Sequence, residues 1–278
     1  KGYRVAIKTL SKEQLHNITE ELTVAPSDGI EPDQDLKYPV FVKTKNYLYM
    51  PRFYANKKLG KPDKKVGVTG QKSNTKFTKG LRDYQKPVAE KCMNHIKKKG
   101  GGILSVYCGF GKTVMAIYLA CQLKKKTLVI VHKTFLQEQW IKSLKFFSDA
   151  KIGSIRQDKV DIEGKDIVIA MLQSISQRDY DDEVFKDFGF VIVDECHHVA
   201  AKVFCKGLQK SCTKLTLGLS ATPKRKDGLI RVLHWYLGDM IHEEKRKPNN
   251  RVCTRVFNYT SNDSKFAEKK RWIKGKVR

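Results

Sequence analysis

The chain has 278 residues, which is enough for one or two domains, and 40% of them are hydrophobic and 10% aromatic. This composition excludes a disordered or collagen-like chain. No run of about 18 apolar residues occurs, so we predict no membrane span. The first residues lack the apolar stretch of a signal peptide, and the absence of an initiator methionine leads us to expect a trimmed chain or fragment.

Charge is the strongest compositional signal, because 55 Lys and Arg against 29 Asp and Glu give a formal net charge of +26. A field of this strength attracts polyanions, and nucleic acid is the polyanion that we expect, although a lysine-rich surface without a partner gives the same count. Seven cysteines form no CxxC pair, which predicts free thiols in a reducing, intracellular compartment. Cys196, His197 and His198 have no further ligands at zinc-finger spacing, so we expect no zinc site.

Residues 1–76 are predicted to form a small N-terminal accessory domain of the α+β type. A helical pattern over Ser11–Leu22 precedes two short β-type runs, Pro39–Lys43 and Tyr47–Met50, which predict a hairpin. The aromatic residues here favour packing of a small core, with stacking on bases as the alternative. Segment 57–80 overlaps the end of this domain, and its eight lysines and single acid indicate a flexible basic connector.

From Leu81 onward, helical patterns alternate with short apolar runs. Runs that are apolar on both faces indicate a parallel sheet covered by helices on both sides. We therefore predict a doubly wound α/β domain over residues 77–245, followed by a basic extension over 246–278 in which Val252–Tyr259 forms one more strand. The runs are Ile103–Tyr107, Thr127–His132, Ile167–Met171, Phe190–Val193 and Leu215–Leu219.

The segment Cys108-Gly109-Phe110-Gly111-Lys112-Thr113 follows the first of these runs and precedes a helical pattern. Glycines let the backbone bend around an anion, and the N-terminus of the next helix offers N–H groups to a phosphate. In such a loop the backbone cradles the β-phosphate of ATP, Lys112 reaches the β- and γ-phosphates, and the Thr113 hydroxyl holds Mg²⁺. The pattern departs from the usual one at Val106, where the first glycine would stand.

Two further motifs complete a candidate active site. Asp194 and Glu195 end an apolar run, 82 positions after Lys112. Asp194 is placed to bind Mg²⁺, and Glu195 to act as the general base that polarises the attacking water. Ser220-Ala221-Thr222-Pro223 closes another apolar run, where the Ser220 and Thr222 hydroxyls can meet His197 and relay the state of the γ-phosphate.

In this order the motifs resemble those of the superfamily 2 helicases of the DExH type. Leu81-Arg82-Asp83-Tyr84-Gln85 resembles the element whose glutamine reads the adenine edge in that family. The string from Gly218 to Gly228 is similar to the branch that contains the transcription/repair helicase and the phage branch-migration helicases. The resemblance covers residues 81–239 and implies the first RecA-like lobe of a P-loop NTPase, with ATP and Mg²⁺ as cofactors. The ATP site that it implies comprises Arg82, Gln85, Cys108, Gly109, Phe110, Gly111, Lys112 and Thr113.

The resemblance also implies contacts to one nucleic-acid strand. Lys133 and Thr134 match one strand-contacting motif and Gln173 matches another, and these groups suit phosphate oxygens. We also expect Arg156 to contact the strand, because it is positively charged and follows an apolar run. The segment Tyr47–Tyr54 is similar to the N-terminal region of helicases from large cytoplasmic DNA viruses.

We therefore expect an ATP-dependent DNA helicase or translocase, with 3′→5′ movement implied by its branch. No arginine-bearing element of a second RecA-like lobe follows Asp239, so we expect that lobe beyond Arg278 and weak ATP hydrolysis by the fragment. Two alternatives remain: an RNA-directed DExH helicase, and a nucleic-acid-binding module with an inactive ATP site. We expect no membrane partner and a location in the nucleus, the cytoplasm, a viral replication compartment or a virion.

Overall fold

The computed structural model describes residues 2–26, 36–62, 69–198, 201–211, 213–222, 228–246, 272–273 and 276–277. Residues 1–245 form one compact unit, and residues 246–278 form a second. In the second unit, strands β14 (Trp272–Ile273) and β15 (Lys276–Val277) pair antiparallel. The strand predicted over 252–259 lies outside the described residues. None of the helices in the described ranges has the length and apolar character that crossing a bilayer requires.

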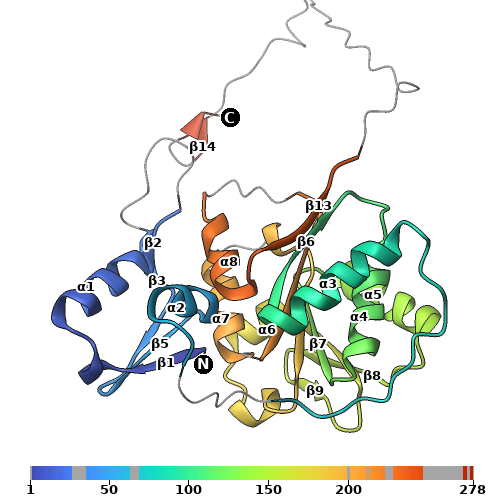
Figure 1. Ribbon diagram of the computed structural model, residues 1–278, viewed down its shortest axis with the longest axis horizontal. Coiled ribbons are helices and arrows are strands. Elements are labelled where there is room, and N and C mark those ends of the chain that lie inside the picture. The colour runs from blue at the N-terminus through green and yellow to red at the C-terminus, as the bar shows by residue number, and fades with distance from the viewer. Residues whose placement is uncertain are drawn as a thin grey trace, which may run out of the picture. The chain divides into compact units, whose positions relative to one another are not determined.

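The first unit is built around a sheet that has eight strands in the described residues, in the order β13-β6-β12-β11-β7-β10-β8-β9 (Figure 1). Every neighbouring pair is parallel except β8 and β9. The predicted apolar runs are therefore neighbours in one parallel sheet, and the predicted α/β class is confirmed. The strands are β6 (Gly101–Val106), β7 (Thr127–Val131), β8 (Ile152–Arg156), β9 (Lys159–Asp161), β10 (Ile167–Met171), β11 (Phe190–Val193), β12 (Leu215–Ser220) and β13 (Met240–Glu244).

The central strands are buried on both faces, which is why they are apolar at nearly every position. All residues of β6, β7, β10 and β11 are buried. Side chains alternate between the faces of a strand, and in β10 Val168 and Ala170 belong to one apolar core while Ile167 and Ile169 belong to the other. A sheet of this kind needs helices on both sides to exclude water.

One face of the sheet is covered by α3 (Gln85–Lys99), α4 (Lys112–Leu123) and α5 (Thr134–Phe147), as Figure 1 shows. The apolar side of α3 is buried at Val88, Cys92 and Ile96. Pro87 lies in the first turn of α3, where its missing N–H costs no helical hydrogen bond.

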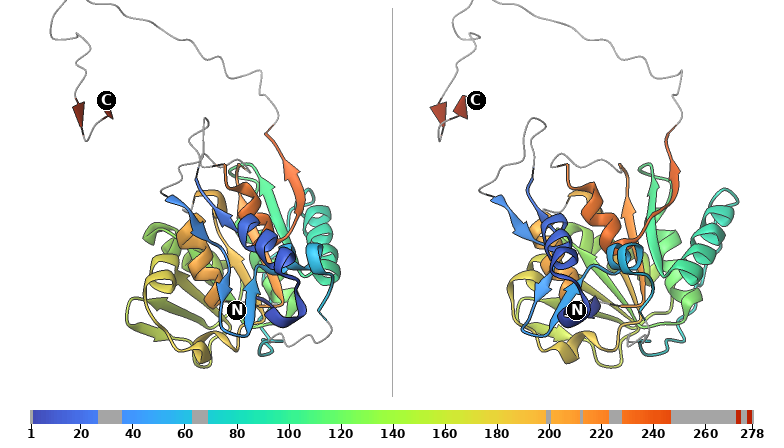
Figure 2. Two further views of the ribbon diagram at one scale, coloured as in Figure 1. Left: turned by 90° about the vertical axis from the view of Figure 1, so that its left-hand side faces the viewer. Right: turned by 60° about the vertical axis from the view of Figure 1, so that its left-hand side comes forward.

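The opposite face is covered by α6 (Leu172–Gln177), α7 (Ala201–Lys210) and α8 (Ile230–Leu237), together with the N-terminal elements. Figure 2 shows these N-terminal elements, in blue, alongside the orange α8. They are β1 (Tyr3–Ala6), the 3₁₀ turn η1 (Ile7–Thr9), α1 (Lys12–Glu21), β2 (Thr23–Val24), β3 (Tyr38–Pro39), β4 (Val42–Lys43), β5 (Tyr47–Met50) and α2 (Arg52–Leu59). Two further 3₁₀ turns are η3 (Asp182–Phe185) and η4 (Cys196–His198).

Both predicted N-terminal elements form. The helix begins after Ser11, whose hydroxyl accepts the Gln14 N–H while the Gln14 side chain accepts the Ser11 N–H, a reciprocal cap. The hairpin pairs β4 with β5, but Pro39 belongs to β3, which pairs with β2. β5 also pairs antiparallel with β1.

The N-terminal elements share an apolar core with one face of the large sheet. The rings of Tyr54 and Trp235 meet edge-on at 5.3 Å between centroids, and the Tyr236 hydroxyl donates to the Val40 carbonyl over 3.0 Å. Leu48, Met50 and Tyr54 are buried. The packing interpretation of this segment therefore holds for those residues, whereas Tyr47 is 36% exposed.

The basic segment 57–80 is not a flexible connector where the structure describes it. Residues 57–59 belong to α2, and residues 69–80 lie along the large sheet domain. The Ser73 side chain is buried and donates to Asp166 Oδ1 over 2.9 Å, and the ring of Phe77 stacks on Phe147. The lysine-rich composition predicted a flexible connector, but backbone pairing such as the Lys72–Lys125 bridge needs no apolar side chain.

Replacement of Arg52 tests how firmly the N-terminal elements are joined to the sheet. Its guanidinium donates to the carbonyls of Gly100 and Thr213, over 3.1 and 3.2 Å, and to that of Lys214. We expect Arg52→Ala to lower the free energy of unfolding by about 1–3 kcal/mol, because partly buried carbonyls lose their donor. Urea unfolding measures this, with the exposed Arg4→Ala as the control. Equal midpoints for parent and Arg52→Ala would contradict it.

Candidate functional site

The predicted motifs gather at one edge of the sheet because each follows the carboxyl end of a parallel strand. The strands β6, β12, β11, β7, β10 and β8 are consecutive neighbours. The phosphate-loop segment follows β6, the Asp194-Glu195 pair follows β11, and Ser220 ends β12. Ligand sites of open α/β sheets lie at this edge.

The loop between β6 and α4 has the bent backbone that its glycines predict. Gly109 and Gly111 adopt φ values of +91° and +103°, in the left-handed region that favours glycine. Gly111 is the N-cap of α4, and a Cβ there would lie 2.3 Å from Gln85 Nε2. Val106, which replaces the usual first glycine, is the buried last residue of β6. The bend therefore begins after this position, and the valine does not prevent it.

Lys112 brings its charge from the first position of α4 to the acidic motif. Its Nζ lies 3.7 Å from Glu195 Oε1 and 3.5 Å from the Val106 carbonyl oxygen. The Lys112 side chain is 10% exposed and that of Glu195 20%. Screening by water is weak at such sites, so the two charges stabilise each other more than a surface pair would. Thr113 follows in the first turn of α4.

Asp194 is a buried carboxylate held by two donors. Its Oδ2 accepts the indole Nε1–H of Trp140 over 2.8 Å, and its Oδ1 accepts the backbone N–H of Glu195 over 2.9 Å. Burial raises the pKa of Asp194 above its usual value and the nearby Glu195 adds to this, whereas the Trp140 hydrogen bond opposes it. Glu195 itself has a left-handed backbone, with φ +47°. That conformation is uncommon for a residue with a Cβ and is frequent at functional sites.

A chain of contacts connects Glu195 with the end of β12. Glu195 Oε2 lies 3.5 Å from His197 Nδ1, and His197 Nδ1 lies 2.9 Å from Ser220 Oγ. The Ser220 hydroxyl also donates to the Thr222 carbonyl over 2.6 Å. The structure therefore joins the predicted coupling residues, with Thr222 taking part through its backbone.

The glutamine of the LRxYQ element contacts the phosphate loop. Gln85 is buried, donates from Nε2 to the Phe110 carbonyl over 2.8 Å and accepts the Arg82 N–H at Oε1 over 3.0 Å. The Arg82 guanidinium donates to the Tyr84 hydroxyl over 3.0 Å, and the Tyr84 ring meets the Phe110 ring edge-on. The oxygen and the nitrogen of the Gln85 amide thus both bond to protein backbone. These bonds connect the start of α3 with the phosphate loop. Cys108 lies exposed in the same loop.

The predicted strand contacts lie on the other half of the same edge. Lys133 and Thr134 follow β7, Gln173 follows β10, and Arg156 ends β8. Gln173 Nε2 donates to the carbonyl of His132 over 2.9 Å, which joins two of these loops directly. Arg156 shares the edge and is exposed, but no hydrogen bond or ion pair joins it to the other three among the described residues.

The donor set beside the phosphate loop fits a magnesium nucleotide. Mg²⁺ prefers oxygen ligands such as carboxylates and hydroxyls, which Asp194 and Thr113 offer. Among the described residues, Glu195 Oε2 is buried and makes no hydrogen bond, and it lies 3.5 Å from His197 Nδ1. Glu195, His197 and His198 could also group around an ion, but His197 Nδ1 is already engaged by Ser220.

Sequence reasoning missed two site residues. One is Trp140 of α5: a buried indole N–H needs an acceptor, and Asp194 supplies it. His132 was assigned to an apolar run, but it lies between the two halves of the edge, with its ring 6.2 Å from that of His198. Its pKa is lowered by burial and by the charges of Lys133 and His198, with Glu195 acting in the opposite direction.

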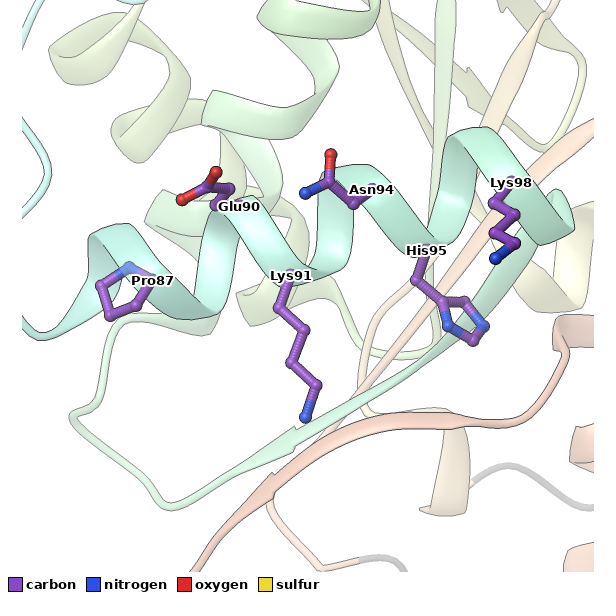
Figure 3. A pocket seen from close by; sticks show the side chains of 6 residues that line it. All are labelled: Pro87, Glu90, Lys91, Asn94, His95 and Lys98. Carbon is purple, nitrogen blue, oxygen red and sulfur yellow. The ribbon is translucent and has the colours of Figure 1, made fainter.

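A surface hollow on α3 is separate from this site. Pro87, Glu90, Lys91, Asn94, His95 and Lys98 line it, all from one helix, as Figure 3 shows. None of the predicted site residues borders it.

Comparison with known proteins identifies the family. Residues 78–225 match the family described as Type III restriction enzyme, res subunit. This chain belongs to that family. The match spans the motifs from the LRxYQ element to the end of β12, so the predicted first RecA-like lobe of a superfamily 2 helicase is confirmed.

Relatives of this Type III restriction enzyme res family member include a protein of Acanthamoeba polyphaga mimivirus with the provisional name of an ATP-dependent RNA helicase. It is 37% identical over 99% of this chain and 54% of its own length. The XPB helicase/translocase subunit of the general transcription and DNA repair factor IIH from Danio rerio is 28% identical over 60% of this chain and 23% of its own. The chain thus spans about half the length of the mimivirus relative and about a quarter of the length of XPB. The similarity of the N-terminal residues to helicases of large DNA viruses is borne out.

The fold also matches that of a solved helicase. The UvsW helicase from bacteriophage T4 superposes with a TM-score of 0.58 and 18% identity, over 84% of this chain and 94% of that one. At this identity the match shows the fold alone.

Replacing Trp140 tests the hydrogen bond to Asp194. We expect Trp140→Phe to lower the free energy of unfolding by about 1.5–3 kcal/mol at pH 8, where the bond stabilises an ionised carboxylate. Without that bond the pKa of Asp194 rises further, and the loss shrinks as the pH falls and Asp194 takes up its proton. Urea unfolding at pH 8 and pH 5 measures both. The control is Trp235→Phe, whose loss should not depend on pH; a pH-independent loss for Trp140→Phe would contradict the assignment.

Proposed function

We propose that the chain is the ATP-binding lobe of a helicase or translocase that hydrolyses ATP to move along or unwind DNA. One observation carries this proposal: the Lys112–Glu195 pair and the candidate strand contacts occupy adjacent halves of one sheet edge. Nucleotide chemistry and strand movement would then act through the same set of loops. The match to the Type III restriction enzyme res family supports it.

Each residue of the nucleotide half has a proposed role. The backbone of residues 108–111 and the Lys112 ammonium would hold the β- and γ-phosphates. Thr113 and Asp194 would hold Mg²⁺, which when bound neutralises charge on these phosphates. Glu195 would accept the proton of the attacking water as general base.

His197 would sense the phosphate state through Glu195 and pass it to Ser220 and Thr222 at the end of β12. The support is the contact chain from Glu195 Oε2 to Ser220 Oγ, with steps of 3.5 and 2.9 Å. Gln85 and Arg82 would position the phosphate loop on the adenine side.

The strand half would bind phosphates through Lys133, Thr134, Gln173 and Arg156. These contacts position a strand without reading its sequence, so they suit a motor that moves along DNA. DNA is favoured by the similarity to the XPB branch, and 3′→5′ movement is carried over from that branch. RNA is the second candidate, because the mimivirus relative carries an RNA helicase name.

The rest of the protein would supply a second RecA-like lobe, since the chain covers 54% of the mimivirus relative. In our proposal residues 1–76 are an accessory domain, residues 77–245 the first lobe and residues 246–278 an extension toward the second. Without arginines from that lobe, we expect only weak hydrolysis by this chain. The free thiols of Cys92, Cys108 and Cys121 suit the reducing compartment that we propose.

Two substitutions test the active site. We expect Glu195→Gln to reduce DNA-stimulated ATP hydrolysis by roughly 10²- to 10⁴-fold, as loss of a general base does, while nucleotide affinity changes little. We expect Lys112→Ala to reduce nucleotide affinity as well, because the phosphates lose their cation. Steady-state ATPase of the full-length protein and equilibrium binding of a fluorescent ATP analogue separate the two effects.

Glu90→Gln and Lys91→Ala are matched controls from the exposed face of α3 (Figure 3). They make the same chemical changes away from the motifs and should leave both measurements unchanged. Unaltered hydrolysis in Glu195→Gln would favour a binding module whose ATP site is inactive.

The choice of nucleic acid is tested with matched substrates. Duplexes of DNA or of RNA, each with a 3′ or a 5′ single-stranded tail, are offered with ATP to the full-length protein. We expect unwinding of the 3′-tailed DNA duplex. Unwinding of the RNA duplexes alone would establish the RNA-directed alternative.

A further inference from the structure

Phe135 is a large apolar side chain that the fold leaves in water at the strand-contact edge. It is 58% exposed and lies in the first turn of α5, directly after β7. The residue before it is Thr134 and the residue before that is Lys133, both proposed strand contacts. Exposed apolar rings are common on protein surfaces, so the position of this one carries the argument.

The helix that carries Phe135 is anchored in the core, and a positive charge lies beside the ring. Leu136 and Trp140 anchor the opposite side of α5 in the core, at 7% and 1% exposure. The Lys133 ammonium lies 5.8 Å from the centre of the Phe135 ring. On the adjacent loop, Gln173 is fixed by its hydrogen bond to the His132 carbonyl. The backbone that carries the ring is thus fixed before a ligand binds, which limits the conformational freedom lost on binding.

Contacts to phosphate oxygens do not need an aromatic ring, whereas the bases of a single strand have free π-faces that stack on one. We propose that Phe135 is a stacking platform for a nucleobase of the bound single strand, while Lys133 contacts the adjoining phosphate. The inference rests on the proposed function and extends it from backbone contacts to a base contact. Because paired bases are already stacked, Phe135 should favour unpaired DNA over duplex.

Phe146 provides a matched control within the same helix. It is 61% exposed, and the Lys79 ammonium lies 5.2 Å from its ring centre. It therefore has the same exposure and the same kind of cation partner as Phe135. Eleven residues of helix separate the two rings by about 16 Å along the axis, at the far end of α5 from the edge.

The test measures binding of a fluorescent single-stranded DNA to the full-length protein over a range of salt concentrations. We expect Phe135→Ala to weaken binding by about 5- to 150-fold, which corresponds to the loss of one stacked base. Its salt slope should stay that of the parent, because no phosphate contact is lost. Lys133→Ala should instead reduce the slope by about 0.7. Phe146→Ala should change neither quantity.

A second oligonucleotide excludes a merely structural effect. In a strand made wholly of abasic sites the phosphates remain but no base can stack, so Phe135→Ala should bind it as the parent does. An equal loss on normal and abasic strands, or no loss on either, would overturn the stacking role. If neither DNA nor RNA binds to the parent protein, the proposed function itself fails, which is a distinct outcome.

Discussion

The arrangement of the candidate site depends on one buried carboxylate. Asp194 is 5% exposed, and burial alone would favour its neutral form. The Trp140 indole and the Glu195 backbone N–H each donate to one of its oxygens. The second of these bonds closes the turn in which Glu195 takes its left-handed backbone, and the Glu195 side chain then reaches both Lys112 and His197. Losing the carboxylate would therefore disturb every later contact in the site.

The order of the strands divides the edge into two halves that meet between β11 and β7. The nucleotide half follows β6, β12 and β11, and the strand half follows β7, β10 and β8. Two contacts bridge the boundary: Trp140 of α5 bonds to Asp194, and the ring of His132, directly after β7, lies 6.2 Å from that of His198. Since α5 also carries Phe135, one helix contacts the carboxylate pair and presents the exposed ring.

The sequence was informative wherever a pattern is local. The apolar runs predicted the parallel strands because burial on both faces favours apolar residues at nearly every position, and the glycines at 109 and 111 predicted a bent loop. The Trp140–Asp194 bond joins residues 54 positions apart, and no local pattern reveals such a pair. Segment 69–80 was misread because its backbone pairing leaves no trace in composition. β13 was not predicted from the sequence. Its sequence is not an apolar run, because two acids end it, and a bulge between Met240 and His242 interrupts its pairing with β6.

Arg52 of α2 is one of the residues that hold the N-terminal elements on the sheet. The Arg52 guanidinium binds the carbonyl of Gly100 just before β6, and those of Thr213 and Lys214 just before β12. These are the amino ends of two neighbouring strands whose carboxyl ends carry the phosphate loop and Ser220. A single cation from α2 therefore joins the N-terminal elements to the amino ends of two neighbouring strands, at the edge opposite the site. The two strands are held in register by their own ladder, from Gly101–Thr216 to Ser105–Ser220, so Arg52 anchors the N-terminal elements to a sheet that is already paired.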